Sequence, residues 1–317
     1  MVAIAGSEPV LMDLDCGGGG SGVGHADEEY LARFVWTAGG ALIAQVLNRS
    51  QTHLKLLCFD PATGARTVVL EERSDTWVNL DHFFTPLHRA YGAPRAPHSE
   101  ASDTGASIAS GFIWGSERTG FKHLYQYAPG GRLIAPLTGG EYVVESVVGV
   151  DEERGLVYFM AAHPTPLEMH LFVTTLWELS PAGTPRPVHA GAFPRQITRR
   201  TGRHAAVLDH ALRSYVDVYD SLERVPSVSL HALGDPSTDS LTIFEPPMAV
   251  ERISRLRLRA PAIVQLRAPT DSITGNDAEQ TAVRHCSQSS KIGPDHSFGP
   301  RRTRLTLGPN LPMTSCC

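Results

Sequence analysis

The amino-acid sequence predicts an all-β fold, a partial β-propeller of about four four-stranded blades. The prediction rests on the length of the apolar runs, on the turn-forming residues that separate them and on the spacing at which sets of runs repeat. From residue 28 onward these runs have the length of strands, and Gly, Pro and Asp separate them. Residues 60–64 and 129–131, for example, have the composition of tight turns. The runs fall into sets of four, and each set covers roughly 45–60 residues, close to the period of propeller blades.

The four sets follow one another along most of the chain. They cover residues 30–70, 77–137, 143–190 and 205–244. A blade buries both of its faces only when neighbouring blades stack against it, so the sets are expected to surround a common axis. Residues 88–110 are rich in Ala, Ser, Pro and Gly, and we predict that they form a loop inserted into the second set.

Two strand assignments inside these sets depend on short runs. Residues 77–84 are predicted to open the second set, and residues 186–190 to close the third. Outside the sets, the glycine-rich residues 1–27 are predicted to be a flexible start. Residues 28–271 then form the propeller. Residues 272–317, which are polar and lack periodicity, are predicted to be a disordered tail unrelated to it.

Composition narrows the class of protein. The chain has 317 residues and a formal net charge of -5, with 42% hydrophobic and 19% charged residues. A weakly acidic chain does not favour nucleic acid, which binds clusters of Lys and Arg. No apolar run approaches the roughly 20 residues of a membrane span, so no membrane partner is expected. The five cysteines include no Cys-x-x-Cys pair, which predicts reduced thiols and a cytoplasmic protein.

Two sequence patterns bear on cofactors and catalysis. Residues 17–22 formally match the dinucleotide fingerprint Gly-x-Gly-x-x-Gly, but a run of four glycines matches almost any glycine pattern, and strands follow it. We therefore favour a linker and predict no cofactor. The chain contains no Gly-x-Ser-x-Gly, the turn that exposes the nucleophile of an α/β-hydrolase. No catalytic residue is assigned, because groupings such as Asp209, His210 and Ser221 are expected from abundance alone.

Three pairs of adjacent glutamates occur, at residues 28–29, 71–72 and 152–153. Two carboxylates on a concave surface can bind the free amine of a peptide through charge-assisted hydrogen bonds. A solvated turn or strand end is the more frequent setting, because Glu is almost never buried unpaired, and we favour it here. The histidines lack the spacing that places two ligands on one helical face, so no metal site is predicted.

Several segments resemble, in order, the N-terminal β-propeller domain of the dipeptidyl peptidase IV family. Residues 114–125, WGSERTGFKHLY, are similar to the family pattern W-[TA]-S-E-[RK]-[TD]-G-F-R-H-L-Y. Further segments that resemble the family are residues 29–33, 75–79, 156–159, 166–171 and 215–217. The resemblance covers about residues 8–271 and is nearest to the cytosolic branch and its plant and bacterial relatives.

The resemblance implies an eight-bladed propeller followed by a hydrolase domain of the prolyl oligopeptidase type, which releases dipeptides from the N-termini of peptides. In the family, the catalytic serine, aspartate and histidine follow the propeller, and a glutamate pair on the propeller binds the substrate amine. The sequence after Asp271 does not resemble a hydrolase domain, and we place the family's glutamate pair upstream of Met1. We therefore expect a propeller fragment of a serine-type dipeptidyl peptidase that is itself inactive. The alternative is a non-catalytic module for protein interaction.

The resemblance also suggests where a peptide would approach. The family's loop that matches the one after Trp77 lies near the peptide-binding site. Asp81 and His82 are therefore the candidate substrate-proximal residues. A peptide substrate is expected only if a hydrolase domain completes the chain.

Self-association is the other partner expectation. A partial ring leaves one blade face uncovered at each end, and repeat arrays need polar caps there to stay soluble. Apolar residues at period two, Phe34 with Trp36 and Val216 with Val218, are expected to lie on these faces. Neither the glycine run nor the tail is expected to cap them, although residues 252–259 are predicted to form an edge strand on one side.

Overall fold

The computed structural model describes most of residues 29–256 and two later strands. The described residues are Val10, Met12, Leu14 and residues 29–37, 39–80, 84–88, 110–179, 185–187, 194–234, 240–256, 262–267 and 281–286. Most of the predicted glycine-rich start, inserted loop and tail therefore lies outside the described residues. The chain divides into two compact units, Met1–Leu258 and Arg259–Cys317.

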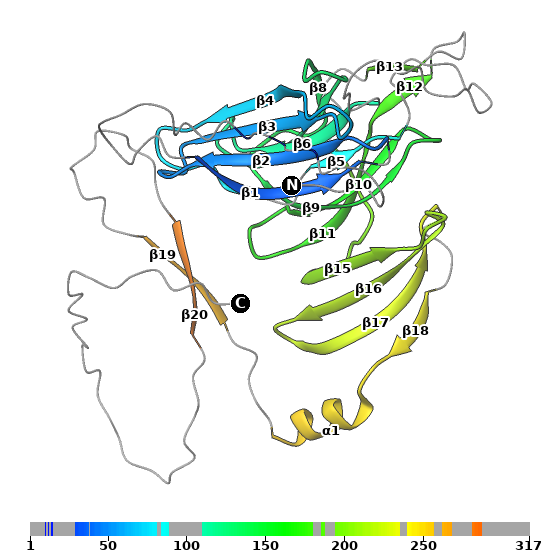
Figure 1. Ribbon diagram of the computed structural model, residues 1–317. Helices are drawn as coiled ribbons and strands as arrows, with labels where there is room; N and C mark the ends of the chain where they lie inside the picture. The colour runs from blue at the N-terminus through cyan, green and yellow to red at the C-terminus, as the bar shows by residue number, and fades with distance from the viewer. Residues whose placement is uncertain are drawn as a thin grey trace. The chain divides into compact units, whose positions relative to one another are not determined.

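Four antiparallel sheets of four strands form the first unit, a partial β-propeller in an all-β fold, as the sequence predicted (Figure 1). The first sheet comprises β1 (Glu29–Trp36), β2 (Leu42–Asn48), β3 (His53–Phe59) and β4 (Arg66–Arg73). The second comprises β5 (Thr85–Pro86), β6 (Phe112–Ser116), β7 (His123–Tyr127) and β8 (Leu133–Pro136). The third comprises β9 (Val143–Asp151), β10 (Leu156–Ala162), β11 (His170–Thr175) and β14 (Arg195–Gln196). The fourth comprises β15 (Arg203–Leu208), β16 (Ser214–Ser221), β17 (Arg224–Ala232) and β18 (Leu241–Phe244).

Apolar clusters between neighbouring sheets form the core. Side chains alternate along each strand, so a central sheet presents one row to each neighbour. In β6, Phe112 and Trp114 pack in the cluster with the first sheet, whereas Ile113 packs in the cluster with the third. The third and fourth sheets meet through a cluster that includes Leu171 and Tyr215. Burying one large apolar side chain contributes about 1.5–3 kcal/mol, so stacking between sheets stabilises the unit.

The second sheet opens later than the sequence predicted. Its first strand is β5, and residues 77–80 are irregular rather than part of a strand. The amide of Trp77 donates to Ser74 Oγ at 3.1 Å, and the amide of Val78 donates to the carbonyl of Gln51 at 2.7 Å. Because these amides are already bonded within a turn and to the first sheet, they do not join a ladder in the second.

The fourth strand of the third sheet was not predicted from the sequence. Its fourth strand is β14, whereas residues 186–190 were predicted to take that place. The segment instead contributes β13 (Pro185–Pro187), which pairs with β12 (Trp177–Leu179) in a separate hairpin. Proline has no amide hydrogen to donate, so a Pro-Arg-Pro segment suits a short edge better than the ladder of a stacked sheet.

The outer face of the first sheet is partly covered. Met12 and Leu14 pack against a buried cluster on that face. The cluster consists of Leu42, Ala44, Val46, Leu57 and Phe59. We expected no capping element at the outer face of the first sheet. At the centre of that face this expectation is wrong, because Met12 and Leu14 cover it. At its margin, on β1, Phe34 and Trp36 stay 64% and 43% exposed, as expected.

A helix replaces the edge strand that was predicted after the fourth sheet. Residues 247–255 form α1 (Pro247–Arg255), which begins with proline at a position where its fixed φ suits a first helical turn. Arg252 and Arg255 lie in the last turn, where cations suit the helix dipole. Within the described residues, no helix is long and apolar enough to cross a membrane.

The second unit contains one described antiparallel pair. The strands β19 (Ala262–Arg267) and β20 (Thr281–Cys286) run in register from Ala262 opposite Cys286 to Arg267 opposite Thr281. Regular structure therefore occurs at β20, inside the segment for which the sequence pattern predicted none.

Candidate functional site

The predicted substrate-proximal residues, Asp81 and His82, lie outside the described residues. The segment that leads to them is described. Trp77 is 59% exposed, and the carbonyl of Leu80 accepts a hydrogen bond from Arg33 Nη2 at 3.4 Å. Asn79 Nδ2 donates to Glu117 Oε2 at 2.6 Å, which ties this segment to the turn between β6 and β7.

A groove with a volume of about 670 Å³ lies beside this segment, between the first and second sheets. Its lining includes Glu72, Trp77, Asn79, Ser116, Arg118 and Tyr127. The groove therefore combines an exposed aromatic ring, amide and hydroxyl groups and charges of both signs. Such a surface offers both an apolar contact and hydrogen bonds to a peptide backbone.

Arg118 forms hydrogen bonds to three other residues that line the groove. Its Nη2 donates to Tyr127 Oη at 2.6 Å and to Glu72 Oε1 at 3.2 Å, and its Nε donates to Ser116 Oγ at 2.9 Å. Its guanidinium also lies 4.3 Å from the centre of the Tyr125 ring. Burial raises the pKa of the Tyr127 phenol, so this hydroxyl stays protonated and accepts from Arg118. Arg118 thereby joins the first sheet to the second.

The glutamate pairs bind partners within the chain. Glu71 bonds to His53 Nε2 at 3.0 Å, whereas its neighbour Glu72 reaches Arg118, because adjacent strand residues point to opposite faces. Glu29 pairs with Lys55 at 2.6 Å. The hydrogen bond from His53 is the main reason that the pKa of Glu71 is lowered.

The third glutamate pair sits at the turn between β9 and β10. Glu152 Oε1 accepts the backbone amide of His88 at 2.8 Å. The neighbouring Asp151 carboxylate caps the same turn, accepting the amides of Glu153 and Arg154 at 3.1 and 2.8 Å. The side chains of Glu29 and Glu72 are only 12% and 14% exposed and form ion pairs within the chain, so the expectation of solvated glutamates does not hold for these two.

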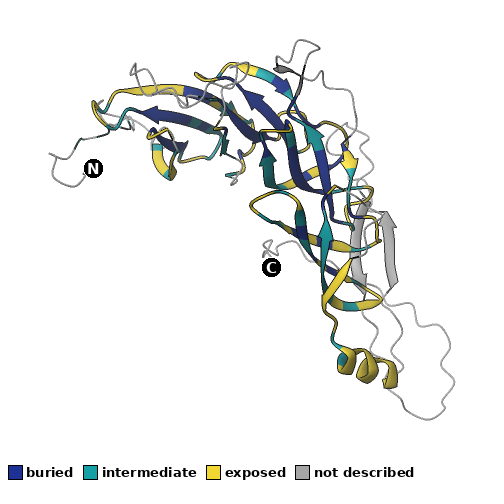
Figure 2. Cartoon of the chain, turned by 90° about the vertical axis from the view of Figure 1, so that its right-hand side faces the viewer, coloured by how far each residue is buried: buried dark blue, intermediate teal, exposed yellow. Residues whose placement is uncertain are grey.

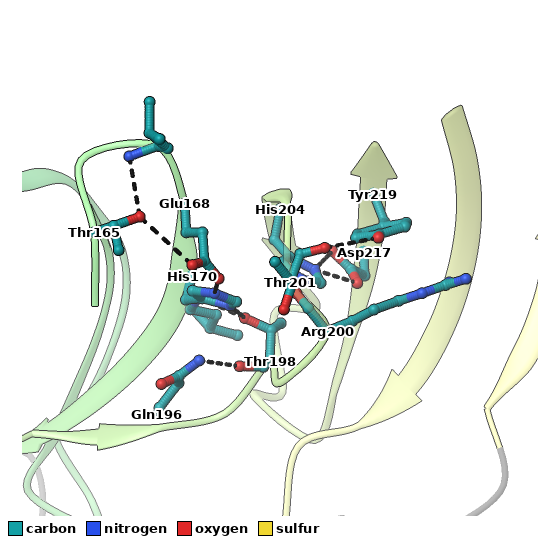
Figure 3. Close-up of polar contacts among 12 residues, drawn as sticks. Thr165, Glu168, His170, Gln196, Thr198, Arg200, Thr201, His204, Asp217 and Tyr219 are labelled. Atoms are coloured by element: carbon teal, nitrogen blue, oxygen red, sulfur yellow. Dashed lines mark hydrogen bonds and ion pairs between the residues drawn. The ribbon is translucent and has the colours of Figure 1, made fainter. Parts of the chain in front are cut away.

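A cluster of polar side chains lies at the junction of the third and fourth sheets, and the sequence reading did not find it (Figure 3). His170 begins β11 and His204 lies in β15, and the centres of their rings are 5.0 Å apart. Both residues are buried, with 1% and 5% of their surface exposed. Each ring is held by partners from its own sheet, so two buried imidazoles meet where the sheets meet.

The hydrogen bonds of His170 define a neutral ring. Thr198 Oγ1 accepts the amide of Leu171 at 3.0 Å, so its hydroxyl hydrogen is free to donate to His170 Nδ1, also at 3.0 Å. His170 Nε2 then carries the ring proton and donates to Glu168 Oε2 at 3.2 Å. Burial, assisted by the nearby His204, lowers the pKa of His170.

His204 has a different environment. Its Nδ1 faces Asp217 Oδ2 at 2.8 Å, and its Nε2 faces the carbonyl of Arg200 at 2.7 Å. Both partners are acceptors, so a hydrogen on either ring nitrogen is donated along one of these contacts. The Asp217 carboxylate is buried, with 5% of its surface exposed. The Arg200 guanidinium lies over the ring of Tyr219, whose hydroxyl donates to the carbonyl of Thr201 (Figure 3).

The order Thr198, His170 and Glu168 has the appearance of a nucleophile, a base and an acid, but it recurs in the second sheet as a structural contact. There Thr138 Oγ1 accepts the amide of Leu124 at 2.9 Å and bonds to His123 Nδ1 at 3.1 Å. Both threonines are buried and hold the end of a strand. The repeat is visible in the sequence as His-Leu-aromatic followed by a Leu-Thr or Ile-Thr pair, which is the signal that could have revealed it.

Asp209 and Ser221, which the sequence groups with His210, lie at opposite ends of β16. Asp209 accepts the amides of Arg213 and Ser214 in the turn before β16. Ser221 is at the far end of β16, and a strand of this length separates its ends by on the order of 20 Å. The structure therefore does not bring Asp209 and Ser221 together.

A second groove, of about 410 Å³, adjoins the histidine cluster. Its lining includes Arg195, Arg199, Arg200, Tyr219, Ser229 and His231. Ser229 Oγ and His231 Nε2 are 2.7 Å apart, and His231 stacks on Tyr215 with 5.0 Å between ring centres. The lining is rich in donors, so polar groups with acceptor atoms match it best.

Comparison with known proteins places these features in a family. Residues 21–226 match the family model of the dipeptidyl peptidase IV N-terminal region. Dipeptidyl peptidase 8 of Mus musculus is 27% identical over 263 residues, which cover 67% of this chain and 26% of that protein. A probable dipeptidyl peptidase 4 of Emericella nidulans is 31% identical over 226 residues, covering 64% of this chain and 28% of that protein.

The fold has a counterpart among solved structures. The crystal structure of Porphyromonas gingivalis dipeptidyl peptidase 4 superposes with a TM-score of 0.60 at 19% identity, covering 76% of this chain and 30% of that one. At this identity the likeness concerns the fold. The chain thus spans 26% and 28% of the length of the two relatives above.

Proposed function

The chain belongs to the family of dipeptidyl peptidase IV N-terminal regions, and we propose that it is the propeller portion of a serine-type dipeptidyl peptidase. In this role it presents a peptide to hydrolytic residues that the 317 residues do not contain. The observation that carries the proposal is the agreement between the family match over residues 21–226 and four consecutive four-stranded sheets. A cytoplasmic location forms part of the proposal, supported by Cys58, a thiol buried in the core of the first sheet.

The proposal includes the absence of peptidase activity in this chain alone. The sequence has no Gly-x-Ser-x-Gly turn, and the buried histidines of the described residues are held by structural partners. A general base must act on a nucleophile that substrate can reach, whereas His170 and Thr198 are buried and Thr198 Oγ1 already accepts the amide of Leu171.

The peptide is proposed to approach the groove beside residues 77–80, with Asp81 and His82 nearby. Support comes from the exposed Trp77 ring and from the hydrogen-bonding groups of Asn79 and Arg118 in the lining of this groove. Trp77 can cover an apolar side chain, while the polar groups bond to the peptide backbone.

A chimera tests this role. The chain, completed with the remaining propeller and hydrolase segments of a relative, should cleave dipeptidyl substrates, and Asp81→Ala with His82→Ala should change its selectivity among peptides. Glu223→Ala, in the exposed turn between β16 and β17, is the matched control and should leave selectivity unchanged. A folded, active chimera whose kinetics are the same for several peptides with and without the double substitution would remove the support for this groove.

The competing function is a non-catalytic propeller module for protein interaction. Exposed apolar side chains on one face of the fourth sheet favour it, with Val207 66%, Leu241 64% and Phe244 55% exposed, because large exposed apolar patches mark interaction sites. The same chimera separates the two, since an interaction module should not restore cleavage when a hydrolase domain is supplied.

A further inference from the structure

The face that the fourth sheet turns toward the third sheet changes from apolar to polar across its strands. Ala206 and Tyr215 pack in the apolar cluster with the third sheet. Farther across the sheet, Ser229 of β17 is opposite Asp217, and Thr242 of β18 is opposite Ser229. Figure 2 shows a change in burial as well, because the strands next to α1 are mostly intermediate or exposed. Solvent and solutes can therefore reach this polar row.

Arginines form the opposite wall of the groove of about 410 Å³ that lies along this polar row. Arg195, in the short strand β14, is opposite Val173 of β11. Paired residues share one face of a sheet, and Val173 packs in the cluster with the fourth sheet, so Arg195 points toward the fourth sheet. Arg199 and Arg200 follow in the connection to β15 and line the same groove. All three arginines are exposed to solvent.

The guanidinium groups of this wall keep hydrogen-bond donors for a ligand. Within the part of the chain that the structure describes, neither Arg195 nor Arg199 forms an ion pair. The Arg200 guanidinium lies 4.3 Å from the centre of the Tyr219 ring (Figure 3). Stacking on a ring uses the face of a guanidinium and leaves the N–H groups at its edge able to donate.

The carboxylates of the lining do not neutralise these arginines. Two carboxylates occur among the described lining residues, Asp217 and Glu245. Asp217 faces His204 Nδ1 at 2.8 Å, and Glu245 is exposed and follows the end of β18. Three guanidinium groups therefore outnumber the two carboxylates, and one carboxylate already has a partner. The groove favours a negatively charged ligand over a neutral or positive one.

Hydroxyl groups on the fourth sheet supply further donors across from the arginines. Ser229 Oγ and His231 Nε2 are 2.7 Å apart. In the tautomer with a hydrogen on Nε2, His231 donates to Ser229, and the serine hydroxyl hydrogen can then be donated to a ligand. Thr242 is opposite Ser229 in the register and adds a second, exposed hydroxyl. An anion in the groove could thus accept hydrogen bonds from both walls.

We propose that this groove binds the phosphate group of a small molecule between the arginines after β11 and the hydroxyls of the fourth sheet. A phosphate monoester presents three terminal oxygens and close to two negative charges, whereas a carboxylate presents two oxygens and one charge. Phosphate therefore makes fuller use of donors on two walls. The groove volume is in the range of small-molecule pockets. Both walls belong to described sheets of this chain, and the proposal is independent of the proposed role in peptide cleavage.

Titration of the full chain, followed by phosphorus NMR at constant ionic strength set with sodium chloride, tests the proposal. Inorganic phosphate and glycerol 1-phosphate are the probes, and the wild type should bind both at one saturable site. The tighter probe identifies the source of the phosphate group as free phosphate or an ester. Arg195→Gln should raise the Kd by about tenfold or more, because it removes a charge-assisted hydrogen bond. Arg132→Gln removes the same charge from an exposed position on the second sheet and is the matched control.

Ser229→Ala tests the wall on the fourth sheet and should also raise the Kd, by about tenfold, while circular dichroism verifies the folding of each variant. A wild type without saturable binding of either probe would overturn the proposal. Equal weakening by Arg195→Gln and Arg132→Gln would overturn it too, because the attraction would then depend on total charge. Binding that neither Arg195→Gln nor Ser229→Ala weakens would place the phosphate outside this groove and contradict the proposal.

Discussion

At the scale of residues, the junction of the third and fourth sheets depends on protonation. His170 is neutral between Thr198 and Glu168, while His204 bonds to two acceptors and lies against Asp217. Two buried imidazoles therefore share one contact, with ring centres 5.0 Å apart. Charging His170 would place a cation in this poorly solvated site.

The lowered pKa of His170 predicts the direction of a pH effect on stability. Above the unfolded value of about 6.5 neither state takes up a proton at this ring, and the contribution to stability is complete. As the pH falls below about 6.5, the unfolded state binds a proton that the folded state resists, so stability is lost. His170→Gln keeps a bond to Thr198 and does not titrate. Thermal unfolding between about pH 7 and pH 5 should show a smaller loss for the variant than for the wild type.

His123 provides a second test of the pH effect on stability. Burial also lowers the pKa of His123, whose Nε2 bonds to the carbonyl of Gly140, so His123→Gln should reduce the pH dependence in the same direction. Identical pH slopes for the wild type and both variants would show that neither ring is the source of the effect.

The Asp217 carboxylate is predicted to be necessary for the fourth sheet. Asp217→Asn removes a buried carboxylate that contacts His204 Nδ1 at 2.8 Å, which is expected to lower the free energy of unfolding by about 3–5 kcal/mol. Asp75→Asn, at an exposed position before the groove segment, should change it by less than about 0.5 kcal/mol. Urea unfolding monitored by fluorescence compares the two, and equal effects at Asp217 and Asp75 would mean that the Asp217 carboxylate does not stabilise the fourth sheet.

At the scale of elements, the contacts between sheets rely on close backbone approach as well as on apolar packing. The hairpin between β7 and β8 brings Gly131 so near the first sheet that an added Cβ would lie 1.6 Å from the carbonyl oxygen of Val69. The residue also has a φ of +87°. Gly131 therefore forms part of a turn and also contacts β4. The composition of the turn predicted the first role but not the second.

Paired alanine substitutions separate the two roles of this turn. Gly130→Ala, with a φ of +80° and no atom within 4 Å of an added Cβ, should cost about 1 kcal/mol through backbone strain. Gly131→Ala should cost about 2 kcal/mol more, because the first and second sheets would have to move apart. Equal thermal shifts for the two variants would mean that the hairpin can leave the first sheet freely.

At the scale of the whole molecule, the repeated sets of strands were predictable and several of their connections were not. Strand sets follow from local apolar runs and turns, so the four sheets could be read from the sequence. Met12 and Leu14 pack on the first sheet although a glycine run separates them from it in the sequence. Such a contact leaves no periodic pattern of apolar residues, so the sequence did not predict it. The hairpin of β12 and β13 and the helix α1 each contain proline near an end, and proline in an apolar run fits both an edge strand and the first turn of a helix.

The candidate site was predicted less completely than the fold, for a related reason. Asp81 and His82 came from a resemblance and lie outside the described residues, so their role stays a prediction. The histidine cluster joins His170, Thr198 and Asp217 from three separate segments, and only a three-dimensional contact identifies it. The sequence contains a repeated His-Leu pair at these positions, but the pair can be assigned to a buried contact only when the hydrogen bonds to threonine are known.

We propose that this chain is a propeller portion without its own catalytic centre. Incubation of the purified 317-residue chain with a chromogenic Ala-Pro or Gly-Pro substrate, and with a covalent probe for reactive serines, tests this most directly. We predict turnover no faster than in buffer and no labelled chain. Turnover above buffer, together with a probe adduct that mass spectrometry locates on a serine of this chain, would contradict the claim.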